Sequence, residues 1–129
     1  MGNSPKEPFV IHVRDVKPFV AQSPDHRELR VMLSPKRDGV APGLAFGVVE
    51  VKPGPTPPPH SHATTQEAWY FLSGKGQIKV GEKVIEVEPG TVVVSPPQVD
   101  HQLINTGTEV LRALFIFTPS GDEVPLIVE

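Results

Sequence analysis

The stretch PGPTPPPHSHATTQEAWYFLSG, residues 53–74, places two histidines directly behind a run of prolines and just ahead of a glutamate and an aromatic segment. The four prolines between residues 55 and 59 fix φ and withhold backbone donors, so the chain reaches His60 in an extended conformation. In an extended chain, residues i and i+2 point to the same face, about 6.6 Å apart at roughly 3.3 Å per residue. His60 and His62 can therefore direct both imidazoles at one ion, and this spacing suits a metal site.

The composition limits the partners and the kind of metal site that the chain can have. With 129 residues the chain is long enough for one domain with one core. Its net charge of −3 and pI of about 5.9 leave no basic surface for nucleic acid, which is therefore not expected as a partner. The absence of cysteine excludes disulfides and thiolates, so a metal must be held by histidine, carboxylate, carbonyl or water.

No stretch of the sequence approaches the roughly 20 apolar residues that span a bilayer, and the first residues, MGNSPKEPFV, lack the apolar segment of a signal peptide. We therefore expect a soluble, cytoplasmic protein with no membrane partner. Residues 1–8 contain Pro, Lys and Glu and little apolar content, so we expect a flexible N-terminal tail there and a single β-barrel domain over residues 9–129.

The apolar pattern repeats every two residues, which is typical of strands. Sixteen prolines argue against long helices, and clusters such as SPPQVD separate the apolar runs. Many short strands at regular spacing indicate an all-β barrel or jelly-roll sandwich, with a hairpin near residues 81–82. The expected strands are Phe9–Val13, Leu29–Leu33, Leu44–Val51, Ala68–Leu72, Gln77–Val80, Val84–Val87, Thr91–Ser95, His101–Asn105 and Val110–Phe117.

Five positions of the opening stretch also match a family motif. The first motif of the cupin family is resembled, in residue type and in spacing, by five residues of this stretch: Gly54, His60, His62, Glu67 and Gly74. A match at five spaced positions is far more specific than a lone short motif. The resemblance implies an all-β fold of one cupin jelly roll, that is, a double-stranded β-helix barrel.

A second segment, from Gly90 to Asn105, resembles the second cupin motif and contains His101. Fifteen residues separate it from the first motif, which is the short spacer of small bacterial cupins. One position departs from the family, because Gln98 stands where glycine is usual. The turn before His101 must then be made without a residue that adopts positive φ freely, or with Gln98 strained.

The resemblance implies one divalent transition metal inside the barrel, and its ligands would be His60, His62, Glu67 and His101. The residues agree with this assignment. His60 and His62 share one face, Glu67 follows a turn, and His101 opens a later strand that can pair beside them. Such a set holds Mn, Fe, Co, Ni, Cu or Zn, and affinity alone does not choose among them. Four protein ligands leave positions open for water, substrate or dioxygen in an octahedral ion.

Alternation along the strands predicts which neighbours of these ligands face the interior. If Glu67 faces inward, Trp69 and Phe71 do so too, and Leu103 lies on the ligand face of its own strand. These three residues are the candidates for a substrate pocket. The alternative is that they are simply core, as most interior residues are.

Fold does not settle function in this family. The resemblance implies a metal-dependent enzyme acting on an oxygen-rich small molecule, as a dioxygenase, decarboxylase, isomerase or lyase. The alternatives are a metal-assisted module that binds or senses a small ligand, and a structural metal that pins the barrel. His12 and His26 lie outside both motifs and are assigned no role.

Self-association is also expected. The run VLRALFIF, residues 110–117, carries apolar residues on both strand faces, more than one barrel interior needs. Small cupins commonly dimerise, so the resemblance implies a homodimer.

Overall fold

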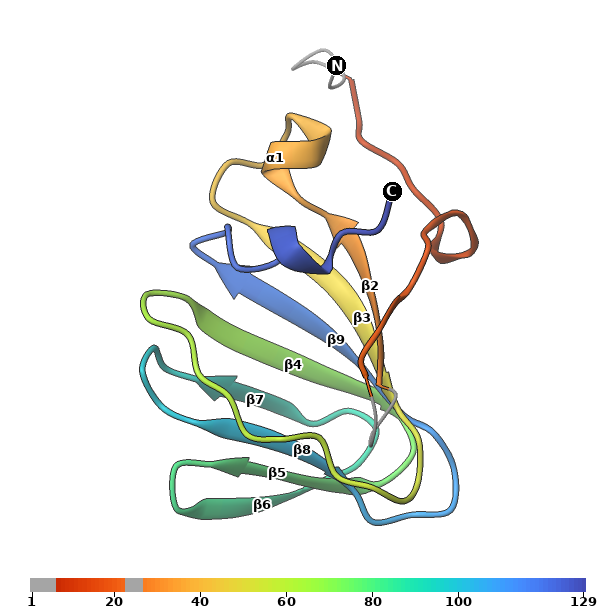
Figure 1. Cartoon of the computed structure of the whole chain (residues 1–129), viewed down its shortest axis with the longest axis vertical. Coiled ribbons are helices and arrows are strands. Elements are labelled where there is room, and N and C mark those ends of the chain that lie inside the picture. Colours follow the sequence, from red (N-terminus) through yellow and green to blue (C-terminus); the bar gives the residue numbers. More distant parts are fainter. Residues whose placement is uncertain (1–6, 23–26) are drawn as a thin grey trace.

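In a computed structural model, the chain is described over residues 7–22 and 27–129, and these parts are nearly all β (Figure 1). Within them, no helix has the length and apolar character needed to cross a membrane. The elements in chain order are η1 (Val13–Asp15), β1 (Phe19–Val20), β2 (Glu28–Leu33), α1 (Pro35–Asp38), β3 (Ala45–Val51), β4 (Gln66–Ser73), β5 (Gly76–Val80), β6 (Lys83–Val87), β7 (Val92–Ser95), β8 (His101–Asn105), β9 (Leu111–Thr118) and η2 (Val124–Leu126).

The strands form two antiparallel sheets. One has six strands in the order β1-β2-β3-β9-β4-β7, and the other has three in the order β6-β5-β8. Strands that are distant in sequence are neighbours in both sheets, as β3 and β9 are, which is the connectivity of a jelly roll rather than of a simple meander. The all-β prediction is confirmed.

Alternating side chains from both sheets fill one core. Along β9 every second residue is buried, including Phe115 and Phe117, and Ile78 and Leu103 join them from the three-stranded sheet. Burying an apolar side chain of this size stabilises the fold by about 1.5–3 kcal/mol. Gly47 lies opposite Phe115 in the register of β3 and β9, and a Cβ at this glycine would collide with the phenylalanine ring.

Eight of the predicted strands are confirmed as β2 to β9, with ends that differ by two residues or fewer. The hairpin at residues 81–82 joins β5 to β6 as expected.

The strand predicted at Phe9–Val13 is wrong. Among the described residues, the first strand begins only at Phe19, and the chain before it passes through η1, where the His12 side chain accepts a hydrogen bond from the Arg14 N–H at 3.1 Å. The alternating pattern has no sheet face to bury against here, since Val10 is 83% exposed. Of the expected N-terminal tail, residues 1–6 lie outside the described residues, as does His26.

Candidate metal centre

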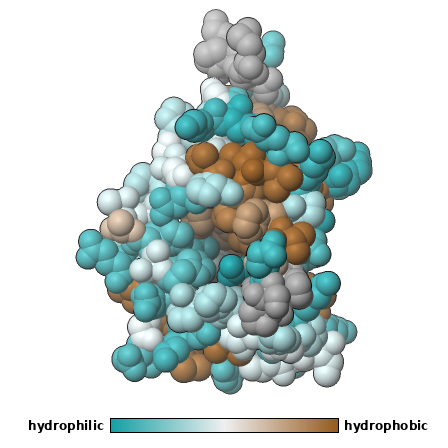
Figure 2. All heavy atoms as spheres, in the orientation of Figure 1, coloured by the Kyte–Doolittle hydropathy of each residue, from teal (hydrophilic) through white to brown (hydrophobic). Residues whose placement is uncertain are grey.

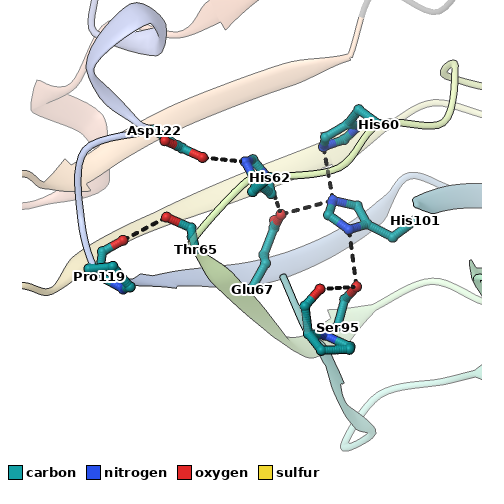
Figure 3. Close-up of polar contacts among 9 residues, drawn as sticks. His60, His62, Thr65, Glu67, Ser95, His101, Pro119 and Asp122 are labelled. Carbon is teal, nitrogen blue, oxygen red and sulfur yellow. Dashed lines mark hydrogen bonds and ion pairs between the residues drawn. The ribbon is translucent and has the colours of Figure 1, made fainter. Parts of the chain in front are cut away.

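Four candidate ligands come together at one end of the core (Figure 3). His60 and His62 lie in the proline-rich segment before β4, Glu67 is the second residue of β4, and His101 is the first residue of β8. Their ligand atoms all lie within 4.8 Å of one another, so this cluster could hold a metal ion. The structure thus brings together the four residues expected from the sequence.

Backbone hydrogen bonds hold the proline-rich segment against the second motif. His60 and His101 form an antiparallel bridge, in which each N–H donates to the carbonyl of the other at 3.0 and 2.8 Å. The N–H of Gln98 donates to the carbonyl of His62 at 2.7 Å. Gln98 adopts φ of 67°, so the turn before His101 is made with this residue in the left-handed region.

The separations between the ligand atoms fit a single ion. Nε2 of His60 lies 3.0 Å from Nε2 of His101, and Oε1 of Glu67 lies 3.1 Å from Nε2 of both His62 and His101. Two ligand atoms that each lie about 2.1 Å from one ion, at right angles, are about 3.0 Å apart. Nitrogen and carboxylate oxygen are the donors that divalent transition metals accept when no thiolate is present.

Two of the imidazoles have a partner on the side that faces away from the cluster. Nδ1 of His62 lies 2.7 Å from Oδ2 of Asp122, and Nδ1 of His101 lies 3.3 Å from Oγ of Ser95. Such outer partners fix the orientation of a ligating imidazole. Asp122 and Ser95 were not among the residues expected from the sequence. Neither stands at a position of the two motifs that the sequence matched, and Asp122 is 60 residues from His62.

Burial and mutual contacts set the protonation of the cluster. Burial, and then the charge of His101, lower the pKa of His60 to about 4. The hydrogen bond that His62 donates to the Glu67 carboxylate raises the pKa of His62, against the effect of burial. Burial works to raise the pKa of Glu67, but hydrogen bonds with His101 and His62 outweigh it and hold this pKa below its usual value. At neutral pH the cluster therefore offers a carboxylate and a neutral His60, the forms that bind metal.

The cluster lines a pocket of about 240 Å³ whose other walls are largely apolar. Figure 2 shows apolar side chains gathered around a hollow on the face that carries η2. Trp69 and Leu103 line the pocket, as the sequence predicts. Phe71 does not: it is fully buried in the core, because it lies two residues farther from the ligand end of β4 than Trp69 does. The remaining apolar walls come from Leu29, Val49, Pro58, Phe115, Phe117 and Leu126.

Among the described residues, two charged side chains besides the cluster also line this pocket. One is Asp122, and the other is Arg27, which lies just before β2. Burial and His101 lower the pKa of His60 most strongly, and the charge of Arg27 adds to the effect, so the guanidinium lies within electrostatic reach of the ligands. The pocket therefore combines apolar walls, one guanidinium and a metal-competent cluster.

Residues 47–117 match the family model of the cupin domain. The chain belongs to the cupin family. An uncharacterised protein from Methanocaldococcus jannaschii is 31% identical over 100 residues, which span 77% of each chain. The glucose-6-phosphate isomerase of Thermococcus litoralis is 45% identical over 76 residues, but these span 54% of this cupin and only 40% of the isomerase.

Solved structures share the fold over most of this cupin. The oxalate decarboxylase of Lactobacillus farciminis, solved as a formate complex, superposes with a TM-score of 0.77 and 26% identity. The superposition covers 92% of this cupin and 37% of the decarboxylase. The aligned parts therefore span less than half of either named enzyme.

Proposed function

We propose that the protein is a mononuclear metal-dependent enzyme that acts on a small, oxygen-rich carboxylic acid. The observation that carries this proposal is that the four candidate ligands, His60, His62, Glu67 and His101, line a pocket that a small molecule can enter. A metal site closed on all sides by protein would support a structural role instead.

The size and lining of the pocket support the proposed class of substrate. At about 240 Å³ it is smaller than the roughly 300–1,000 Å³ of pockets that hold drug-sized ligands. The positive charge of Arg27 in the pocket lining favours a substrate that carries a carboxylate. Trp69 and Leu103 can pack against a short carbon skeleton and exclude water. A short acid therefore fits better than a sugar phosphate.

Each residue has a distinct task in this proposal. The three histidines and Glu67 would hold a divalent transition metal, which supplies Lewis-acid polarisation of a substrate oxygen or redox chemistry with dioxygen. The positive charge of Arg27 would partly neutralise a substrate carboxylate in this mostly apolar pocket. The apolar walls would strengthen both electrostatic contacts by keeping the local dielectric low.

The named relatives support an oxygen-rich substrate and offer two reaction classes. One relative is named for the decarboxylation of oxalate and the other for the isomerisation of glucose 6-phosphate. We place decarboxylation of a short acid first, because of the pocket volume, and isomerisation of a sugar phosphate second. Dioxygenase and lyase reactions on a short acid belong to the same proposal, since they use the same ligand set.

The test begins with elemental analysis of protein purified without oxygen. We then expect turnover of at least one member of a panel of short mono- and dicarboxylic acids. Turnover is measured as carbon dioxide release, oxygen uptake and product formation. His60→Ala, which lacks one ligand, is the matched inactive control. Turnover of glucose 6-phosphate alone would move the assignment to the isomerase class. Purified protein that neither contains nor takes up a transition metal would refute the proposal.

A second function, metal-assisted binding without catalysis, is favoured by one observation. Among the described residues that line the pocket, Asp122 is the one carboxylate outside the ligand cluster, and it is already engaged with His62. A free general base is therefore not evident. Calorimetric binding of a short acid to the metal-loaded protein, with no conversion of that acid, would support this second function over the first.

A further inference from the structure

The segment that follows β9 lies beyond the part of the chain that matches the cupin family model, which ends at residue 117. It runs through residues 119–127, includes η2, and brings Asp122 to the back of His62 (Figure 3). We propose that Asp122 is a positioning residue of the metal centre, which sets metal affinity by fixing the tautomer and orientation of His62. This inference rests on the metal site of the proposed function.

Among the described residues, the contact between Asp122 and His62 is the shortest side-chain polar contact of the cluster. Oδ2 of Asp122 lies 2.7 Å from Nδ1 of His62. A carboxylate only accepts hydrogen bonds, so Nδ1 carries a proton, and Nε2 is the nitrogen that is left to bind a metal once it has no proton. Nε2 is the atom that faces Oε1 of Glu67, at 3.1 Å. Asp122 thus selects the one neutral tautomer of His62 that can bind a metal on the side of the cluster.

Asp122 is partly exposed, but the backbone on both sides of it is tied to buried groups. Its neighbour Glu123 is 1% exposed. Oε2 of Glu123 accepts a hydrogen bond from Oγ of Ser34, and Oε1 accepts one from the N–H of Gly121, both at 2.6 Å. Ser34 is itself fully buried, at the junction of β2 and α1. The segment is therefore anchored immediately after Asp122.

A second anchor lies before Asp122. The hydroxyl of Thr65, which is 2% exposed, donates to the carbonyl of Pro119 at 2.8 Å. Thr65 stands between His62 and Glu67 in the sequence, so this bond joins the C-terminal segment directly to the loop that carries the ligands. Because two buried hydrogen-bonded groups flank Asp122, they fix the backbone from which its carboxylate reaches His62. A positioning role needs such preorganisation, whereas a chance surface contact does not.

The test measures affinity for Co²⁺ and Zn²⁺, each used alone, by competition with a chromophoric chelator. We expect Asp122→Ala to weaken binding by about 10–100-fold, the range found when an outer partner of a ligating histidine is removed. Asp122→Asn should weaken it less, because the amide oxygen can still accept from Nδ1. The matched control is Asp15→Ala, which removes an exposed aspartate from η1 and should leave affinity unchanged.

The second measurement reads the tautomer directly. Two-dimensional ¹⁵N spectra of the Zn²⁺-loaded wild-type protein should show His62 protonated at Nδ1, and Asp122→Ala should show a mixture or loss of this signal. The melting temperature of the metal-free variant should match that of the metal-free wild type, which separates positioning from a general loss of stability. Equal affinity and an unchanged tautomer in Asp122→Ala would overturn the inference. A wild-type protein that binds neither ion would instead refute the proposed function.

Discussion

At the scale of single residues, the four candidate ligands can be separated from the other histidines by substitution. We expect His60→Ala and His62→Ala each to remove most of the metal, since each leaves at most three ligands. The loss in affinity should exceed the roughly 10–100-fold that follows removal of an outer partner. His12→Ala is the control, because His12 is exposed and only caps η1. Metal content of the purified variants decides the matter, and equal occupancy in all three would contradict the assignment.

Metal affinity should fall as the solution is acidified, with His62 responding first. The hydrogen bond that His62 donates to the Glu67 carboxylate raises the pKa of His62 above its ordinary value of 6.5, so His62 begins to take up a proton at or above that pH. A protonated imidazole cannot bind metal, so apparent affinity should fall by about tenfold per pH unit below this pKa. Burial and His101 hold the pKa of His60 near 4, so this residue competes with metal only in more acidic solution.

The measurement is the apparent dissociation constant for Zn²⁺ from pH 8 down to pH 4. Calorimetry in buffers of different ionisation enthalpy should also show proton release on binding when the pH is at or below the pKa of His62. An affinity that is constant across this range would mean that the histidines are not the principal ligands.

The sequence predicts the ligand cluster because its spacing is local. His60, His62 and Glu67 lie within eight residues of one another, and His101 stands in a second motif at a regular distance. Asp122 and Arg27 reach the same pocket only through the arrangement of the sheets, from positions with no local pattern. Their contribution could not be read from the sequence, because an isolated aspartate or arginine is most often a solvated surface residue.

At the scale of elements, the turn before β8 holds one residue in an unfavourable backbone conformation. Gln98 adopts φ of 67°, a conformation that costs a residue with a Cβ about 1–2 kcal/mol. Its side chain contributes only a 3.4 Å contact to the carbonyl of Ala63, while its backbone N–H makes the 2.7 Å bond to His62. Gln98→Gly should therefore keep the backbone hydrogen bond to His62 and remove the free-energy cost of the positive φ.

We expect Gln98→Gly to be more stable than Gln98→Ala by about 0.5–1 kcal/mol, after the greater entropy of glycine in the unfolded chain is subtracted. Chemical denaturation of both metal-free variants measures the difference. Alanine is the matched control, since it also removes the side-chain contact but keeps the Cβ. If Gln98→Ala is as stable as Gln98→Gly, the turn carries no conformational cost.

Alternation predicts strands well where the opposite face is covered, and fails where it is not. Along β9 and β4 the alternating residues face a shared core, and both strands were expected within two residues of their ends. The run from Phe9 to Val13 alternates too, yet Val10 and Ile11 are 83% and 37% exposed, and no strand among the described residues pairs with them. A pattern in sequence therefore becomes a strand only when the fold supplies an edge to pair with and a face to bury against.

At the scale of the whole molecule, the outer face of the six-stranded sheet presents apolar side chains near its edge. Val92 and Val94 of β7 are 62% and 53% exposed, and Tyr70 of β4, which pairs with Val92, is 41% exposed. Edge strands with exposed apolar residues are usually covered by a partner. We therefore predict a homodimer that uses this face.

Sedimentation of the wild-type protein should give the mass of a dimer, and the double variant Val92→Lys, Val94→Lys should give a monomer. Val84→Lys is the matched control, because Val84 is 54% exposed but lies on β6 of the other sheet. A monomeric wild type at micromolar concentration would contradict the prediction. Disruption by Val84→Lys alone would place the contact on the three-stranded sheet instead.

The metal-free protein should remain folded, because the apolar core extends well beyond the ligand cluster. The buried apolar cluster draws on both sheets and includes Phe71, Ile78, Leu111 and Phe115. It supplies burial worth roughly 25 cal/mol per Å² whether or not an ion is bound. Removal of an ion would leave the imidazoles and Glu67 lining a pocket of about 240 Å³, where water can hydrogen-bond to them. The loss of stability on removal of the ion should therefore be confined to the metal site.

Bound metal would still stabilise the protein by mass action. Free ion at a thousand times its dissociation constant contributes about 4 kcal/mol. For a chain of this length that corresponds to a rise in melting temperature of roughly 10–20 °C. A chelated sample should keep its β-type circular dichroism and a cooperative melt, and should regain the higher melting temperature when the ion is returned. If chelation unfolded the chain at room temperature, as it does small zinc-dependent domains, the metal would be structural and the proposed enzyme would lose its main support.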